Sequence, residues 1–141
     1  DAKLAAQLAE VVERQAGDMI PQHVANSLNA LPKLPAAEAA MSAEGWVALL
    51  QGVERTAPEM EPQHVGNTLN GLGKLESAEA AMSAAGWVAV AESAARTAPE
   101  MNPQNVANTL NALSRLPAAE AAISAVGWVA LAESAARTAP E

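Results

Sequence analysis

The sequence has no cysteine, phenylalanine or tyrosine among its 141 residues. Without cysteine, the chain can form neither a disulfide bond nor a thiolate metal site, and it has no cysteine nucleophile. Its only aromatic side chains are Trp46, Trp87 and Trp128. Half of the residues are hydrophobic, but most of these are alanine, the strongest helix former, and no alternating apolar run of the strand type occurs. The composition therefore predicts an all-α fold.

Basic side chains are also scarce, with eight lysines and arginines against sixteen aspartates and glutamates and a net charge of −8. Such a charge repels polyanions at long range, which disfavours non-specific binding to nucleic acids and anionic membranes. The sequence also lacks an apolar run of about 18 residues and a charged-then-apolar leader. We therefore expect neither a transmembrane helix nor a signal peptide within it.

One stretch occurs three times. The segment PQNVANTLNALSRL, which begins at Pro103, recurs in variant form from Pro21 and Pro62, at a spacing of 41 residues. A periodic chain buries its apolar faces between neighbouring units, so we expect an elongated α-solenoid. The last unit ends like the second, without a changed cap, so we expect the array to continue beyond it. The predicted parts are an N-terminal capping helix at residues 1–20 and repeat units at residues 21–61, 62–102 and 103–141.

The first helix of each unit is predicted from its start signal and its apolar stripe. In the third unit, Asn102 and Pro103 are residue types favoured at the cap and at the first position of a helix. Val106, Leu110 and Leu113 then follow at helical spacing, which predicts the buried face of this helix.

A proline is expected to end this first helix in two of the three units. Pro117 disfavours helical geometry at the residue before it, which predicts a helix over 103–116. The second unit has Glu76 in place of this proline, so we expect a softer break there.

The rest of each unit is rich in alanine and contains a glycine before the tryptophan. In the third unit we expect a short helix at 118–125, which Gly127 ends in a left-handed conformation, and then a second long helix at 128–139. One continuous helix kinked at Gly127 is the alternative.

We interpret the three tryptophans as core residues, because no other large aromatic side chain can fill the space between units. In an uncapped last unit, Trp128, Val129 and Leu131 would be partly exposed. This exposure predicts end-to-end self-association of the chain.

The first helix of each unit also carries a polar row opposite its apolar stripe. Amide side chains both donate and accept hydrogen bonds, so the rows can pair with a peptide backbone or with base edges. A lysine or arginine at the end of each row can bind carboxylates or phosphates. Asparagine is a poor helix former, which argues against an idle surface. A plain solvated face and hydrogen bonds between units are the alternatives. The polar rows, our candidate ligand-binding residues, are Gln22, Asn26, Asn29 and Lys33, then Gln63, Asn67, Asn70 and Lys74, and then Gln104, Asn108, Asn111 and Arg115.

A variable position lies next to these rows, with His23 and His64 in the first two units and Asn105 in the third. Residues one repeat apart should lie about 10 Å from each other, too far to share a zinc ion. We therefore expect either a position that modulates specificity or neutral drift at an exposed site.

Signals for catalysis are missing. The sequence has no G-x-S-x-G, phosphate-loop or H-E-x-x-H motif, and its carboxylates recur a whole repeat apart. We therefore expect no enzymatic activity, no metal and no cofactor.

The phrase MNPQNVANTLNALSRLP resembles armadillo- and HEAT-type helical repeats, and most closely those of plant-pathogen type III effectors known as SKWP-repeat proteins. Their name-giving tetrapeptide falls at Ser114, Arg115, Leu116 and Pro117. The unit is also similar to the octotricopeptide repeats of algal organelle proteins. These resemblances imply a right-handed α-solenoid without catalytic residues, and the second implies sequence-selective binding of single-stranded RNA.

Taken together, the sequence favours a scaffold that binds an extended peptide or protein segment along the polar rows. A modular reader of single-stranded RNA is the first alternative. A consensus or designed array without any ligand is the second.

Overall fold

A computed structural model describes residues 2–139, and within this range the protein is all-α, as predicted. None of the described helices is long and apolar enough to cross a membrane. The α-helices are α1 (Ala2–Gln15), α2 (Pro21–Ala30), α3 (Pro35–Ala40), α4 (Ala43–Thr56), α5 (Pro62–Leu72), α6 (Glu76–Ala81), α7 (Ala84–Thr97), α8 (Pro103–Leu113), α9 (Pro117–Ala122) and α10 (Ala125–Thr138). Short 3-10 helices are η1 (Ala16–Asp18), η2 (Leu31–Lys33), η3 (Ala57–Glu59) and η4 (Ala98–Glu100).

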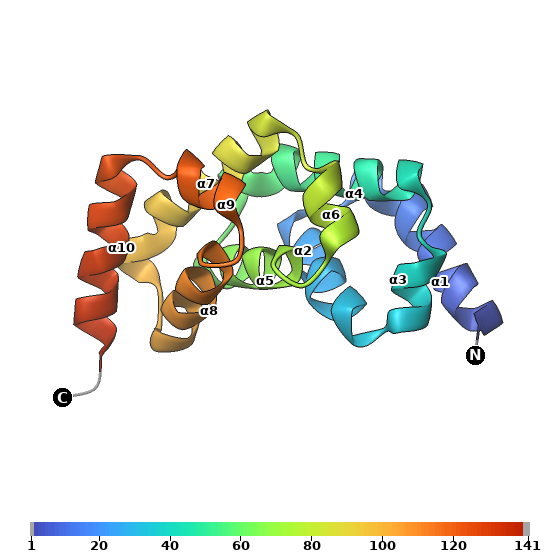
Figure 1. Ribbon diagram of the computed structural model, residues 1–141, viewed down its shortest axis with the longest axis horizontal. Helices are drawn as coiled ribbons and strands as arrows, with labels where there is room; N and C mark the ends of the chain where they lie inside the picture. Colours follow the sequence, from blue (N-terminus) through green and yellow to red (C-terminus); the bar gives the residue numbers. More distant parts are fainter. Residues whose placement is uncertain (1, 140–141) are drawn as a thin grey trace.

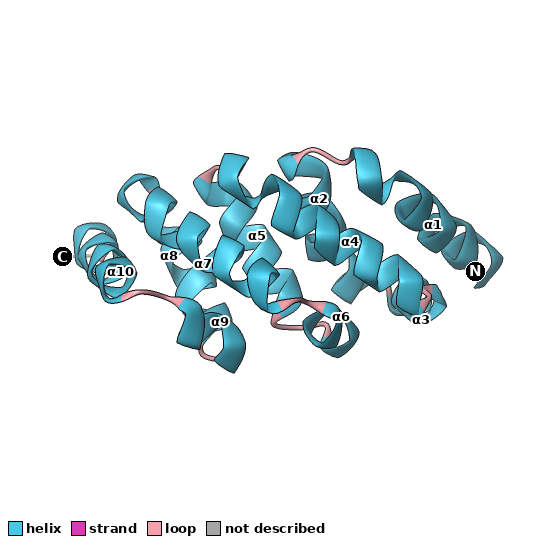
Figure 2. Ribbon diagram, turned by 90° about the horizontal axis from the view of Figure 1, so that it is seen from above, coloured by secondary structure: helices cyan, strands magenta, loops and turns pink. Residues whose placement is uncertain are grey.

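The helices form an arch, with α1 and α10 at opposite ends (Figure 1). We refer to α2, α5 and α8 as the A helices and to α4, α7 and α10 as the B helices. The A helices pack side by side, α5 between α2 and α8, and the B helices follow one another in the same order (Figure 2). Each B helix also packs on the A helix before it in the sequence. The short helices α3, α6 and α9 connect each A helix to the next B helix.

The predicted apolar stripe forms the core. Val65, Leu69 and Leu72 on α5 are fully buried, and Trp46 and Trp87 are 5% and 6% exposed, which confirms their assignment to the core. The large apolar side chains thus hold the A helices against the B helices.

The last helix, α10, is only partly exposed to solvent. Trp128 and Val129 are 38% and 56% exposed, as predicted, whereas Leu131 is fully buried, so its predicted exposure was wrong. Leu131 belongs to the hydrophobic core because α10 packs on α7 and α8.

The B helices begin earlier than predicted, because a serine caps each of them. In the last unit, Ser124 has an extended backbone and its hydroxyl accepts the N–H of Gly127 at 3.0 Å, so α10 starts at Ala125. Gly127 therefore lies inside the helix, and no described glycine has a positive φ. A Cβ at this position would approach Ile123 Cγ2 to 3.0 Å and Ala95 Cβ to 3.1 Å. The glycine permits close packing and neither ends nor kinks a helix, so both predictions for it were wrong.

The A helices are shorter than predicted. Helix α8 ends at Leu113 and is followed by a turn in which Leu116 N–H donates to Leu113 C=O at 3.3 Å. Leu116 and Leu75 are both buried and both non-helical, with φ of −122° and ψ of 82° and 94°. The break at Glu76 is therefore not softer, because the N–H groups of Lys74 and Leu75 close the turn with the same backbone hydrogen bonds as those of Arg115 and Leu116 before Pro117.

Candidate ligand-binding surface

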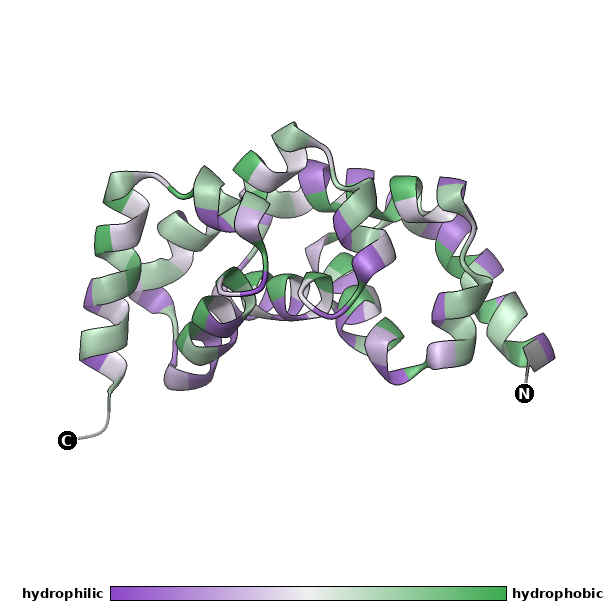
Figure 3. Ribbon diagram, viewed as in Figure 1, coloured by the Kyte–Doolittle hydropathy of each residue, from purple (hydrophilic) through white to green (hydrophobic). Residues whose placement is uncertain are grey.

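The A helices present a surface without carboxylates. Their sequences, PQHVANSLNA, PQHVGNTLNGL and PQNVANTLNAL, contain no aspartate or glutamate. Hydrophilic residues follow the lower side of α5 and α8 in Figure 3. The helices themselves therefore carry no carboxylate. Exposed carboxylates flank them, since Glu61 directly precedes α5 and Glu76 lies two residues after Lys74.

The two ends of each polar row are open to solvent. All six residues concerned are exposed, namely Gln22, Gln63, Gln104, Lys33, Lys74 and Arg115. The cations follow the carboxyl ends of the A helices, where the helix dipole favours positive charge. Among residues 2–139, these three cations have no hydrogen-bond or ion-pair partner, so their charges are open to solvent.

Three other cations, all arginines, donate hydrogen bonds to backbone carbonyl oxygens of the protein itself. Arg96 on α7 donates from Nη2 to the carbonyl oxygens of Ala57 and Met60 at 3.1 and 3.0 Å. Arg55 and Arg137 make the equivalent pairs of hydrogen bonds one unit earlier and one unit later. These arginines hold each B helix to the 3-10 turn before the neighbouring A helix and are structural.

The asparagines in the middle of the rows lie at the contacts between A helices. Asn70 donates from Nδ2 to Asn29 Oδ1 at 3.4 Å. Both side chains are half-buried, whereas the equivalent Asn111 is exposed because no further A helix packs on α8 within the described residues. Asn67 and Asn108 are also half-buried, and their equivalent on α2, Asn26, is exposed. The alternative of hydrogen bonds between units is therefore confirmed for Asn29 and Asn70.

The variable position has a capping function. His23 and His64 accept the backbone N–H of Ile20 and Glu61 on Nδ1 at 3.4 and 3.1 Å. An imidazole that accepts on Nδ1 carries its proton on Nε2.

In the third unit, Asn105 accepts the N–H of Asn102 on Oδ1 at 3.2 Å, and Asn102 accepts the N–H of Asn105 at 2.7 Å. Histidine and asparagine are thus interchangeable as acceptors at the third position of a helix, a pattern that a search for capping boxes could have found.

A carboxylate fixes the N-terminal helix. Glu13 on α1 accepts the hydroxyl of Ser42 at 2.7 Å and the N–H of Ser42 at 2.8 Å, at the start of α4. The hydroxyl and then the amide lower the pKa of Glu13, because both hydrogen bonds stabilise the charged form. Glu13 therefore anchors α1 to α4. Within residues 2–139, no group of three or more His, Asp or Glu side chains could hold a metal ion.

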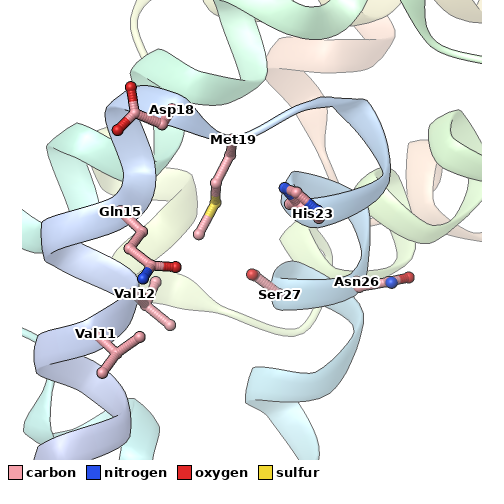
Figure 4. A pocket seen from close by; sticks show the side chains of 8 residues that line it. All are labelled: Val11, Val12, Gln15, Asp18, Met19, His23, Asn26 and Ser27. Atoms are coloured by element: carbon pink, nitrogen blue, oxygen red, sulfur yellow. The ribbon is translucent and has the colours of Figure 1, made fainter.

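Sequence reasoning missed a cavity between α1 and α2. It has a volume of about 550 Å³ and is lined on one side by Val11, Val12 and Gln15 and on the other by His23 and Ser27. Figure 4 shows the side chain of Met19 pointing into the space between the two helices. No sequence motif marks this cavity, because its walls come from two helices that only the fold brings together.

Comparison with known proteins gives one partial match. A family model described as "Protein of unknown function (DUF1601)" matches residues 48–69 and 87–110, less than half of the chain. Both stretches run from a B helix through its 3-10 turn into the next A helix, and they end at equivalent residues, Leu69 and Leu110. No curated protein and no solved structure matches the chain.

Proposed function

We propose that the chain is a right-handed α-solenoid that acts as a non-enzymatic scaffold and binds an extended, acidic peptide or protein segment along the A helices. The recurrence of the same helices in each 41-residue unit and the packing of α2, α5 and α8 side by side support the solenoid. The handedness follows from the resemblance to armadillo- and HEAT-type repeats.

One observation supports the assignment of the ligand to this surface. The A helices offer exposed glutamines and a cation per unit, and they carry no carboxylate, although the whole chain has a net charge of −8. An extended peptide exposes backbone N–H and C=O groups that glutamine side chains can pair with in both directions. Acidic side chains of the peptide would then meet Lys33, Lys74 and Arg115.

The two kinds of amide have different roles in this proposal. Gln22, Gln63 and Gln104 are exposed and face the ligand. Asn29 and Asn70 are engaged with each other and set the distance between neighbouring rows. The ligand contacts are therefore concentrated at the glutamines and at the three cations.

Single-stranded RNA is the second candidate. The same three cations occur once per unit and face outward, so they could contact successive phosphates, while the glutamines could pair with base edges. The overall negative charge disfavours this ligand, because polyanions are repelled at long range.

A titration at low and at physiological salt separates these candidates. The probes are a library of extended acidic peptides and a pool of single-stranded RNAs, each fluorescently labelled, with binding read by anisotropy. The cation variant is Lys33→Ala, Lys74→Ala and Arg115→Ala together, and the glutamine variant is Gln22→Ala, Gln63→Ala and Gln104→Ala together. The matched controls are Arg14→Ala on α1 and Gln51→Ala on α4, which replace exposed residues outside the surface.

Peptide binding that both triple variants abolish, and that the controls leave unchanged, is the expected result. RNA binding that falls steeply with salt, with a slope that the cation variant reduces by about 0.7 per lost contact, would replace the peptide by RNA. If neither probe binds at low salt, the A helices are a solvated face and both candidates are wrong.

A further inference from the structure

A small pocket lies in the middle of the array, between α4, α6 and α7. Helix α4 packs on both α6 and α7 (Figure 2). Helices α1 and α10 pack on the outer sides of α4 and α7, so neither end of the described chain borders the pocket. The pocket has a volume of about 120 Å³ and is lined by Val47, Leu50, Gln51, Glu54, Ala81 and Ser83.

The first unit has a hydrogen-bonded carboxylate at the equivalent place. Glu13 and Ser42 precede Glu54 and Ser83 by 41 residues. Glu13 accepts both the hydroxyl and the N–H of Ser42. A Cβ added to Gly45 would collide with the Glu13 carboxylate, so this carboxylate lies against the glycine. The same residue types are present in the second unit, and the same contact is therefore expected there.

In the second unit a methionine takes the place of the carboxylate. The atoms nearest to a Cβ added to Gly86 are Met82 Sδ at 2.5 Å, Met82 Cγ at 3.2 Å and Ser83 Oγ at 3.3 Å. Ser83 accepts the N–H of Gly86 at 2.9 Å. Glu54 is half-buried and has no hydrogen-bond or ion-pair partner within residues 2–139. It therefore lines the pocket as an unpaired carboxylate.

The third unit has no carboxylate at this position. Its equivalent residue is Ala95, whose Cβ would lie 3.1 Å from a Cβ added to Gly127. Of the three equivalent places, one thus holds a paired carboxylate, one an unpaired carboxylate and one a methyl group. The unpaired carboxylate is therefore a property of the second unit and not of the repeat.

The three helices around the pocket attract positive charge. Their two cations, Arg55 and Arg96, are already bonded to backbone carbonyl oxygens. The excess of carboxylates leaves a net negative charge on the three helices, which favours a cationic ligand. These carboxylates are Glu44, Glu54, Glu76, Glu79 and Glu92.

We propose that this pocket binds the side chain of a lysine presented by a partner protein. The ammonium group donates a hydrogen bond to the Glu54 carboxylate, and the methylene stem packs on Val47 and Leu50, which are 43% and 2% exposed. Lysine fits a single carboxylate in a small pocket because it carries a compact charge on a flexible apolar stem, whereas arginine presents a planar fork. The proposal concerns the B helices and does not rest on the proposed function of the A helices.

Helix dipoles place the ammonium group on the α4 side of the pocket. Glu54 lies in the last turn of α4, where the dipole favours positive charge. The first turn of α7, which Ser83 caps, favours negative charge. The ligand is therefore expected to contact Glu54 through its charge and α7 only through its stem.

The experiment titrates the full chain with Nα-acetyl-lysine N-methylamide and follows the backbone amide resonances by NMR. The matched probe is the norleucine analogue, which has the same stem without the ammonium group. One pocket variant, Glu54→Gln, removes the charge, and the other, Ala81→Leu, fills the pocket and keeps the carboxylate. The control is Glu44→Gln, an exposed carboxylate on the same helix that does not line the pocket.

We expect saturable, about millimolar binding of the lysine probe, with shifts at Val47, Glu54 and Ser83. Each pocket variant, and the norleucine probe, should weaken binding about fivefold or more, whereas Glu44→Gln should leave it unchanged.

Several outcomes would overturn the proposal. If the lysine probe does not bind, or if binding survives either pocket variant, the pocket is not a lysine site. Equal effects of Glu44→Gln and Glu54→Gln would show diffuse attraction, and tighter binding of the arginine analogue would replace lysine by arginine. Tighter binding of free lysine than of the blocked probe would assign the pocket to the amino acid. Self-association that Glu54→Gln abolishes in sedimentation experiments would assign it to a second copy of the chain.

Discussion

Replacing Gly71 by alanine should destabilise the protein, although alanine is the better helix former. Gly71 is buried in α5, where this helix crosses α2. A Cβ at this position would lie 2.6 Å from the carbonyl carbon of Leu28 and 2.9 Å from Leu28 Cβ, and closer still to the carbonyl oxygen. These neighbours are backbone and a fully buried side chain, so α2 and α5 would have to move apart.

The size of the effect follows from two opposing terms. The exchange of glycine for alanine inside a helix contributes about 1 kcal/mol of stability. Overpacking of a tight interface costs about 1–3 kcal/mol. The third unit has Ala112 at the equivalent position, 2% exposed, so two A helices can accommodate alanine if their spacing adjusts. We therefore expect a net loss of about 1 kcal/mol and no loss of the fold.

Gly66, five positions earlier on the same helix, is the matched control. A Cβ there would make only ordinary contacts, the closest at 3.8 Å, and the other two units have Ala25 and Ala107 at this position. Gly66→Ala should therefore raise the free energy of unfolding by about 0.5–1 kcal/mol.

Urea unfolding followed by circular dichroism gives both free energies, and thermal melting should move by about 3–5 °C per kcal/mol. Helix propensity alone predicts that both variants are stabilised equally. If Gly71→Ala is as stabilising as Gly66→Ala, then α2 and α5 do not approach each other through their backbones, and the explanation given for the glycine is wrong.

Three further predictions concern single side chains. Glu13→Gln should lower stability near neutral pH and remove a pH dependence. Because the pKa of Glu13 is lowered in the fold, the carboxylate stabilises the fold at pH values above the ordinary pKa of 4.5, and this contribution is lost as the pH falls further. The melting curves of the wild type and the variant should therefore converge in acid. Arg96→Ala should cost about 1 kcal/mol, because the carbonyl oxygens of Ala57 and Met60 each lose one hydrogen bond, whereas Arg14→Ala on the surface of α1 should stay within about 0.5 kcal/mol. Trp87→Ala should cost about 3–5 kcal/mol in urea unfolding, and Trp128→Ala clearly less, because Trp87 is 6% exposed and Trp128 is 38% exposed; equal losses would show that Trp128 is covered in solution.

The repeat, the A helices and the core could be predicted because local signals agree there. Proline at the first helical position, a capping residue before it and apolar residues at helical spacing all indicate the same helix. The exposure of the glutamines followed from the same helical geometry, since they lie opposite the buried stripe. The cations are exposed for another reason, because they lie after the ends of the A helices.

The wrong predictions share a cause: the structural role of each residue depends on contacts that the local sequence does not show. Gly127 looks like a helix stop in the sequence, but it lies inside α10, where an added Cβ would crowd Ile123 Cγ2 at 3.0 Å and Ala95 Cβ at 3.1 Å. The break before Glu76 is made by the same backbone turn as the break before Pro117, so the absence of a proline does not weaken it.

The sequence by itself determined that this protein is built from repeated helices and which face of each A helix is polar, because the helical period places residues on faces without reference to other helices. Only the tertiary structure decided which polar residues are free. It engages Asn29 with Asn70, uses His64 to cap a helix and leaves Lys74 exposed, because hydrogen bonds and burial between helices depend on distances that the order of residues does not contain. It also decided where a cavity opens between α1 and α2, since a cavity is a property of packing and not of any one segment.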